Sequence, residues 1–299
     1  MKIIEEQINE KPFYSKVLAP YFSNCRIGVV DIETTGLSPA RNKVILGGIL
    51  FFEGERKRMV QIFADSRDEE PDLLAEYAQL LYQADVLITY NGTGFDIPFI
   101  KKRMTEHGMR PGNIDKIHHI DMLRILRRYS DLKNVLPDLK QKTVERYFGD
   151  DSERTDEISG AESVKLYNEY CAASGHRAEA IRDKILLHNR DDVVRLSNLT
   201  KVTRQLDIHK IMYCEGWPGV GNITISSEMI RVDGTKPLIV PAEDVSGHTI
   251  VDLIALDIDI PELQRLPGYE SGYLDLGTER NIHFMEVNAL INSLREKYR

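Results

Sequence analysis

The chain has 299 residues, of which 42% are hydrophobic and 29% are charged, and it carries a net charge of -8 at pH 7. This composition predicts a soluble protein with one large domain or two, each able to bury a core. The cysteines Cys25, Cys171 and Cys214 are widely spaced, which argues against both a zinc site and a disulfide framework. The N-terminus lacks an apolar run of signal length, and no stretch is apolar enough to span a bilayer, so we expect a cytoplasmic protein without membrane contact.

The negative charge lies mainly in the C-terminal third. Residues 205–299 contain 8 Lys and Arg against 15 Asp and Glu, whereas residues 1–204 contain 31 against 32. Basic residues of the near-neutral part cluster in three places: Lys101-Lys102-Arg103; Arg124, Arg127 and Arg128; and Lys133, Lys140 and Lys142. We interpret these clusters either as a phosphate track or as solvated helix faces.

In chain order, residues 1–22 are expected to form a short helical or irregular lead-in, interrupted by Pro12 and Pro20. Residues 27–37 then read as a buried strand. Side chains alternate across a strand, so Asp31 and Glu33 share one side while Val30 and Ile32 pack on the other. Two neighbouring carboxylates favour a divalent cation, and oxygen ligands suit Mg²⁺ or Mn²⁺. The alternative is a strand end whose acids face water.

Residues 43–52 and 58–64 are predicted to be two more strands, which makes an antiparallel meander. An amphipathic helix over residues 71–84 and a short strand over 85–90 follow. The glycine-rich turn after it leads into a helix that starts near Asp96. We expect Asp96 on the face that Phe99 and Ile100 bury, where it needs a partner, or else as the cap of its own helix.

The helix predicted over residues 178–204 has an apolar stripe that contains two polar residues, His188 and Asp192. A buried carboxylate is expected to be paired or to bind a metal. The alternatives are a core histidine and a simple helical ion pair. Asp191 lies about 100° further round the helix and is expected to face solvent.

Together these segments resemble the three motifs of the DEDD 3′-to-5′ exonucleases, which have the RNase H-like fold. The motifs are Val-Val-Asp31-Ile-Glu33-Thr-Thr-Gly-Leu, Tyr-Asn91-Gly-Thr-Gly-Phe95-Asp96, and His188-Asn-Arg-Asp-Asp192-Val. Residues 139–156 point to the bacterial YprB-like branch. The resemblance covers about residues 24–204. It implies an α/β fold with an RNase H-like mixed sheet flanked by helices, in a domain over residues 23–204.

The resemblance implies a two-metal phosphodiesterase that acts on the 3′ end of single-stranded DNA or RNA. Asp31, Glu33, Asp96 and Asp192 would bind two Mg²⁺ or Mn²⁺ ions and take part in catalysis. His188 would orient or deprotonate the attacking water. Related enzymes use a Tyr four residues before the last Asp or a His five before it, so a His at the spacing of the Tyr is a departure from the family pattern.

Five further residues are candidates for substrate binding. Thr34, Gly36 and Leu37 are expected to contact the terminal nucleotide, through backbone amides or by wedging against a base, although Thr-Gly-Leu is also an ordinary turn. Asn91 is expected to hold a phosphate, and Phe95 is a further candidate for substrate binding. Asp121 is expected to cap the helix that follows it, or to support the metal ligands from behind.

Residues 205–299 are expected to form a smaller β-rich region. Strands are predicted over residues 222–231, 237–240 and 249–256, with a turn at 233–234 and a final helix over 288–298. No motif there carries chemistry, and its acidity favours a partner-binding or structural role. The alternatives to an exonuclease are a catalytically silent nucleic-acid-binding or scaffold protein with the same fold, and an RNase H-type endonuclease.

Overall fold

The computed structural model describes residues 1–13, 22, 25–112, 114–149, 158, 160–206, 211, 217–218, 223–225, 230–232, 242–244, 246–278 and 281–297. The chain divides into two compact units. The N-terminal unit comprises Met1–Phe13 and Arg26–Val202, and the C-terminal unit comprises Tyr14–Cys25 and Thr203–Arg299. No helix among the described residues has the length and apolar character needed to cross a membrane.

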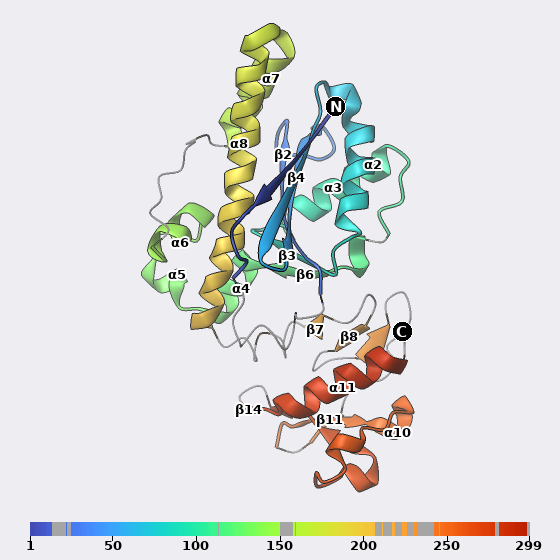
Figure 1. Ribbon diagram of the computed structural model, residues 1–299. Coiled ribbons are helices and arrows are strands. Elements are labelled where there is room, and N and C mark those ends of the chain that lie inside the picture. The colour runs from blue at the N-terminus through green and yellow to red at the C-terminus, as the bar shows by residue number, and fades with distance from the viewer. Residues whose placement is uncertain are drawn as a thin grey trace. The chain divides into compact units, whose positions relative to one another are not determined.

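A six-stranded mixed sheet forms the centre of the N-terminal unit, with the strand order β1-β4-β3-β2-β5-β6 (Figure 1). Its strands are β1 (Lys2–Ile8), β2 (Ile27–Thr34), β3 (Val44–Glu53), β4 (Arg56–Phe63), β5 (Val86–Thr89) and β6 (His118–Asp121). The predicted antiparallel meander is confirmed as β2-β3-β4. β5 pairs in parallel with β2, and β6 in parallel with β5, which makes β2 a central strand.

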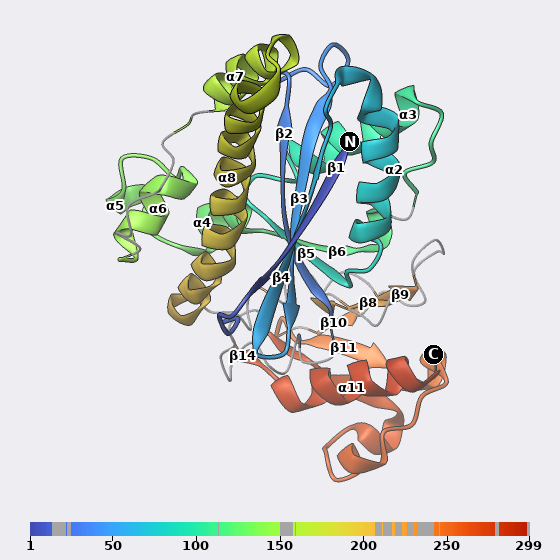
Figure 2. The same cartoon turned by 45° about the horizontal axis from the view of Figure 1, so that its top comes forward.

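Helices cover both faces of this sheet. They are α2 (Glu70–Leu81), α3 (Asp96–Glu106), α4 (Met122–Tyr129), α5 (Leu132–Val135), α6 (Gln141–Tyr147), α7 (Gly160–Ala172) and α8 (Gly175–Leu199). Figure 2 shows α7 and α8 on one side of the sheet and α2 and α3 on the other. The α/β fold predicted from the sequence, a mixed sheet flanked by helices, is therefore confirmed.

Two hydrophobic clusters hold these layers together. The larger joins β2, β3 and β4 to α2 and α3, and includes Val30, Ile32 and Tyr77. The smaller joins the other face of the sheet to α7 and α8, and includes Phe63, Tyr167 and Ile185. Because Val30 and Ile32 pack into the larger cluster, strand alternation turns Asp31 and Glu33 toward α8.

Two expectations for the N-terminal unit are wrong. Residues 2–8 are not helical or irregular but form β1, which pairs with β4 at the sheet edge. Both faces of this edge strand stay partly exposed, so its sequence lacks clear apolar alternation. Asp191 does not face solvent, because its side chain is only 12% exposed and lies 3.7 Å from Arg190 Nη1. α8 contacts α7 as well as the sheet, so it buries more than one stripe.

The C-terminal unit is built from short strands and a final helix. Its described elements are β7 (Trp217–Pro218), β8 (Ile223–Ile225), β9 (Ile230–Val232), β10 (Ala242–Glu243), β11 (Thr249–Asp252), α10 (Leu253–Leu256), β12 (Tyr273–Asp275), β13 (Gly277–Thr278), β14 (Asn281–Ile282) and α11 (Phe284–Lys297). β10, β11 and β12 form one sheet, β7, β8 and β9 a second, and β13 and β14 a two-stranded ribbon.

The predictions for this unit are only partly correct. Within the predicted strand over 222–231, the described residues 223–225 and 230–231 belong to two antiparallel strands, β8 and β9, rather than to one. The strand predicted over 249–256 ends at Asp252, whose side chain accepts a hydrogen bond from the Ala255 amide and caps α10. The final helix starts at Phe284, earlier than predicted. The predicted turn at 233–234 and strand at 237–240 lie outside the described residues.

Candidate active site

Two acids of the central strand β2 face α8. Glu33 is buried and Asp31 is half-buried. Asp96, also buried, is the first residue of α3, directly after the β5 turn. Its Oδ1 accepts a hydrogen bond from the Ile32 amide at 3.2 Å, across 64 positions of sequence. Asp96 is thus tied to β2 between the two strand acids, while the cap position of α3 is held by Phe95 without a side-chain hydrogen bond.

α8 brings His188 and Asp192 to the same place. The Nε2 atom of His188 lies 3.6 Å from Glu33 Oε1 and 3.6 Å from Asp192 Oδ2. The imidazole is buried, whereas Asp192 is half-buried. If His188 took part only in an ion pair within α8, its only acidic neighbour would be Asp192. Because it also lies close to Glu33, His188 connects helix α8 to strand β2.

Burial and mutual repulsion act on the carboxyl groups of this cluster. Burial raises the pKa of Glu33 to about 8, and the charges of Asp192 and Asp96 contribute, while the buried Ser163 hydroxyl of α7 works in the opposite direction. Burial raises the pKa of Asp96 to about 7. The pKa of Asp31 rises well above its usual value, through burial first and then through Asp96, Asp192 and Glu33. The raised pKa values mean that, without a cation, these neighbouring acids do not all ionise easily at the same time.

A divalent cation would reverse this effect, because it stabilises ionised carboxylates. The donors that Asp31, Glu33, Asp96 and Asp192 offer are hard carboxylate oxygens, which suit Mg²⁺ or Mn²⁺. The arrangement of these residues therefore fits the metal ligands expected from the sequence.

Asn189 holds Asp31 in place, and the sequence analysis missed it. Its Nδ2 atom donates to Asp31 Oδ2 at 2.9 Å, and its Oδ1 atom accepts from Gln61 Nε2 at 2.9 Å. Gly48 of β3 makes room for it, since a Cβ at Gly48 would lie 2.1 Å from Asn189 Oδ1. The sequence shows only an Asn next to His188 and a glycine inside a predicted strand, and the contact between them appears in the structure alone.

Asp121 shapes the turn that leads to Asp96. It caps α4, as expected, by accepting hydrogen bonds from the Leu123 and Arg124 amides. It also accepts hydrogen bonds from the Asn91 amide at 2.9 Å and the Thr93 amide at 3.0 Å. Asn91 is exposed and has a φ of 67°, a left-handed conformation that Asn tolerates. Phe95 is half-buried, with its ring 5.4 Å from that of Phe99.

The loop after β2 carries the other three substrate candidates. Thr34 Oγ1 donates to the Gly36 carbonyl at 2.8 Å, and the loop closes where the Thr35 amide donates to the Lys43 carbonyl at 2.9 Å. Gly36 has a φ of 151°, and a Cβ there would lie 2.8 Å from Asn42 Oδ1. At the tip, Leu37 is 85% exposed. The structure therefore presents an apolar side chain to solvent on a well-bonded loop.

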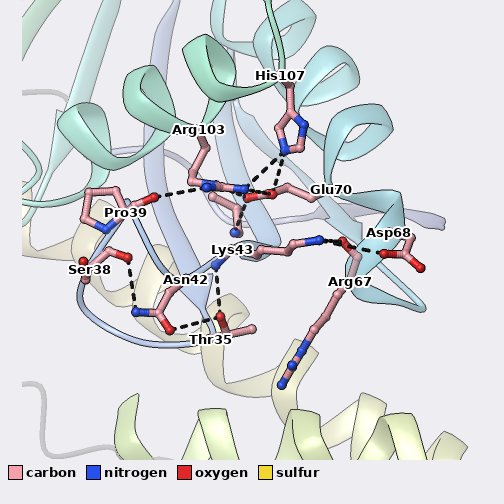
Figure 3. Close-up of polar contacts among 11 residues, drawn as sticks. Thr35, Ser38, Pro39, Asn42, Lys43, Arg67, Asp68, Glu70, Arg103 and His107 are labelled. Carbon is pink, nitrogen blue, oxygen red and sulfur yellow. Dashed lines mark hydrogen bonds and ion pairs between the residues drawn. The ribbon is translucent and has the colours of Figure 1, made fainter.

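A buried ion cluster fixes this loop to the helices behind it (Figure 3). Glu70 of α2 receives hydrogen bonds from Arg103 Nη2 at 2.6 Å and from the Val44 amide at 2.8 Å, and His107 Nε2 lies 2.8 Å away. Arg103 also donates to the Pro39 carbonyl at 3.2 Å. Burial alone would raise the pKa of Glu70, but these hydrogen bonds lower it.

Of the three basic clusters, residues 101–103 are engaged with acids. Lys101 pairs with Asp115, Lys102 with Glu106, and Arg103 with Glu70. The other two clusters lie on α4, α5 and α6, where Arg124, Arg127, Arg128, Lys133, Lys140 and Lys142 are exposed. Lys140 is also paired, with Asp138 Oδ2 at 3.2 Å, but its side chain stays exposed. We retain these two clusters as candidates for a phosphate track because all six of their side chains are exposed.

A protein-family model matches residues 29–204, which is more than half of the chain, and it describes RNase_H_2 of the RNase_H superfamily. The chain belongs to the RNase_H_2 family. Membership in this superfamily indicates a nuclease, that is, a hydrolase of nucleic acid, and such nucleases generally use divalent metal ions.

Among solved structures, the chain is similar to the family B DNA polymerase of the hyperthermophilic archaeon Pyrobaculum calidifontis. The two are 19% identical with a TM-score of 0.48, and the match covers 60% of this chain and 24% of the polymerase chain. The matched region thus spans about a quarter of that protein. No curated protein matches the chain.

Proposed function

We propose that the protein is a metal-dependent 3′-to-5′ exonuclease of the DEDD type, in the YprB-like branch. The observation that supports this most is the meeting of four acids and a histidine from β2, α3 and α8. Burial raises the pKa values of three of these acids, and repulsion from neighbouring acids of the cluster adds to the shifts of Asp31 and Glu33, so ionised carboxylates there need a cation.

Asp31, Glu33, Asp96 and Asp192 would hold two Mg²⁺ or Mn²⁺ ions. When bound, these ions would supply Lewis acidity to the attacking water and offset charge on the leaving 3′ oxygen. Asn189 keeps Asp31 in position by donating to its Oδ2. His188, from its place between Glu33 and Asp192, would orient the water and accept its proton.

The substrate end would lie along the loop after β2. Thr34 and Gly36 would contact the terminal nucleotide through the loop backbone, and the exposed Leu37 would pack against its base. Asn91 and Phe95 stand on the turn before Asp96 and would contact the strand there. This arrangement favours a free strand end over the middle of a duplex, and hence an exonuclease over an RNase H-type endonuclease.

The preceding nucleotides would follow the basic surface of α4, α5 and α6. Its exposed cations are Arg124, Arg127, Arg128, Lys133, Lys140 and Lys142. Tyr147 of α6 is 50% exposed and offers a ring on which a base can stack. A surface that offers both cations and an exposed aromatic ring suits a single strand.

We place this activity in residues 23–204 and in the cytoplasm, and we assign residues 205–299 a partner-binding or structural role. Cell fractionation tests the location. A chain truncated after residue 204 tests the assignment of the activity, because we expect it still to degrade the substrate.

The experiment incubates purified protein with end-labelled single-stranded DNA and RNA, in Mn²⁺ and in EDTA. We expect degradation in Mn²⁺ alone, and its loss in Asp192→Asn. The matched control is Asp183→Asn on the same helix, where the side chain is 63% exposed and removal of the charge leaves activity intact. A protein that binds the strands with no degradation under any of these conditions is the silent binding protein instead.

A further inference from the structure

The C-terminal unit contains a compact cluster of two histidines and one aspartate. His248 directly precedes β11, Asp275 ends β12, and His283 follows β14. His248 Nδ1 lies 2.8 Å from Asp275 Oδ2, and His283 Nδ1 lies 3.6 Å from the same oxygen. The possible metal-binding atoms of the three residues all lie within 4.8 Å of one another. Three separate segments thus converge on one carboxylate oxygen.

The backbone fixes each of the three residues. Asp244 Oδ1 accepts hydrogen bonds from the Ser246 amide at 2.8 Å and the His248 amide at 2.9 Å, which closes the turn that carries His248. The other oxygen of Asp275, Oδ1, accepts from the Gly277 amide at 2.8 Å. Surrounding hydrogen bonds thus orient His248 and Asp275, as is usual for the residues that bind a metal ion.

His283 is anchored on both sides. Its amide donates to the Leu276 carbonyl at 3.0 Å, and its carbonyl accepts from the Val287 amide of α11 at 3.0 Å. Gly277 permits this approach, since a Cβ there would lie 2.2 Å from the Asn281 carbonyl oxygen and 2.8 Å from the His283 nitrogen. The β13-β14 ribbon therefore places His283 against Asp275 through its backbone geometry.

The distances suit an ion as well as hydrogen bonds. Two ligand atoms bound about 2.1 Å from a tetrahedral ion stand roughly 3.4 Å apart. The distances of 2.8 and 3.6 Å lie on either side of that value. Without an ion, the His248 Nδ1 contact is a hydrogen bond to the carboxylate, and His283 Nδ1 lies 3.1 Å from the Asp275 carbonyl oxygen. Small side-chain rotations would exchange these hydrogen bonds for metal bonds.

We propose that His248, Asp275 and His283 bind one divalent transition-metal ion of the Zn²⁺ class. Two imidazole nitrogens and one carboxylate oxygen are borderline donors, which favour Zn²⁺, Co²⁺ or Fe²⁺ over Mg²⁺. The residues are 30%, 37% and 30% exposed in that order, so an ion can enter from solvent and water can complete its coordination. The excess of acids in residues 205–299, 15 against 8 basic residues, also favours a cation.

The bound ion would stabilise a part of the chain whose described strands are only two to four residues long. It would join the β11-β12 sheet, through His248 and Asp275, to the β13-β14 ribbon, through His283. Because such a site forms only in the folded chain, its binding free energy adds to folding stability. This second metal site is chemically distinct from the oxygen-only candidate active site, and the proposal does not depend on nuclease activity.

The test is a Co²⁺ titration of the full chain followed by visible absorption, with Zn²⁺ as competitor. It uses the background Asp31→Asn/Asp192→Asn, which removes metal binding at the candidate active site. We expect one Co²⁺ per chain, displaced by Zn²⁺ and not by Mg²⁺. His283→Gln and Asp275→Asn each weaken binding about 100-fold or more. The control His176→Gln, an exposed histidine at the start of α8, leaves the affinity unchanged.

Co²⁺ affinity that is the same in His283→Gln, Asp275→Asn and the control overturns the proposal. Should a variant fail to fold, X-ray absorption of the Zn²⁺-loaded full chain in the same background replaces it. We expect two imidazoles at about 2.0 to 2.1 Å in the Zn²⁺ shell. A shell with one imidazole or none contradicts the assignment.

Discussion

Removing one negative charge from the acid cluster should stabilise the metal-free protein at high pH. The pKa of Glu33 is about 8 in the folded chain against 4.5 for a free side chain, and that of Asp96 is about 7 against 3.8. Between these limits the folded state binds more protons than the unfolded state. The free energy of unfolding in EDTA therefore falls as the pH rises from about 4 to about 8.

The size of this decrease in the free energy of unfolding follows from the pKa shifts. One pKa unit corresponds to about 1.4 kcal/mol, so Glu33 titrating alone would cost roughly 5 kcal/mol across the interval. The acids do not titrate independently, because protonation of one relieves repulsion on the others, and their side chains can move apart. We therefore expect the free energy of unfolding to fall by about 2 to 4 kcal/mol across the interval. Asp31→Asn removes one charge yet keeps an oxygen for the Asn189 amide. It should raise stability at pH 8 by about 1 to 2 kcal/mol.

Urea unfolding followed by far-UV circular dichroism at pH 5, 6, 7 and 8 in EDTA measures these changes. Saturating Mn²⁺ at pH 8 should restore wild-type stability and help Asp31→Asn much less, because binding to the folded state shifts the equilibrium. The exposed Asp183→Asn serves as control and should follow wild type throughout. Equal wild-type stability at pH 5 and pH 8, or a less stable Asp31→Asn at pH 8, would refute the electrostatic reasoning.

Three other predictions concern activity. His188→Ala should lower kcat by about 100-fold or more at saturating Mn²⁺, on the order of a lost general base, and His188→Tyr should recover part of that loss. Gly48→Ala should displace Asn189 and reduce both Mn²⁺ affinity and activity by about 10-fold or more, which Mn²⁺ titration of the rate measures. Arg127→Glu/Lys133→Glu should weaken single-strand binding and flatten its salt dependence by about one to two units of slope, measured by fluorescence anisotropy.

Each of these predictions has a matched control. His176→Ala removes an exposed histidine of α8, Gly112→Ala adds a methyl group where no atom lies within 4 Å, and Arg177→Glu reverses an exposed charge near the start of α8. Full activity in His188→Ala would mean that His188 is a core histidine. Equal losses in Gly48→Ala and its control, or equal salt slopes for Arg127→Glu/Lys133→Glu and Arg177→Glu, would contradict the roles given to Asn189 and to the basic surface.

The sequence predicted the part of the fold that has clear periodicity. The meander β2-β3-β4 and the helix α8 have strong apolar patterns, and the polar positions within those patterns are the residues that the structure brings together. Alternation along β2 was enough to place Asp31 and Glu33 on one side. Local sequence therefore predicted the four strands β2 to β5 of the central sheet, but not the strands β1 and β6 at its two edges.

The features that could not be predicted from the sequence depend on contacts between segments that are distant along the chain. β1 is an edge strand with partly exposed faces, so its pattern is weak. Asn189 could be understood only with Gly48 and Gln61 in place around it. His248, Asp275 and His283 are 27 and 8 positions apart, a spacing that matches no short metal motif, and the spacing of the cysteines gives no information about a site built from His and Asp.

The most direct test of the proposed function compares a linear, 5′-labelled single strand with a circular strand of the same sequence, in Mn²⁺. A 3′-to-5′ exonuclease needs a free 3′ end, so the linear strand should shorten in single-nucleotide steps with the label retained, and the circle should stay intact. Asp31→Asn and EDTA should each abolish the shortening. Cleavage of the circle, or shortening that persists in Asp31→Asn, would contradict an exonuclease that works through the acids of β2, α3 and α8.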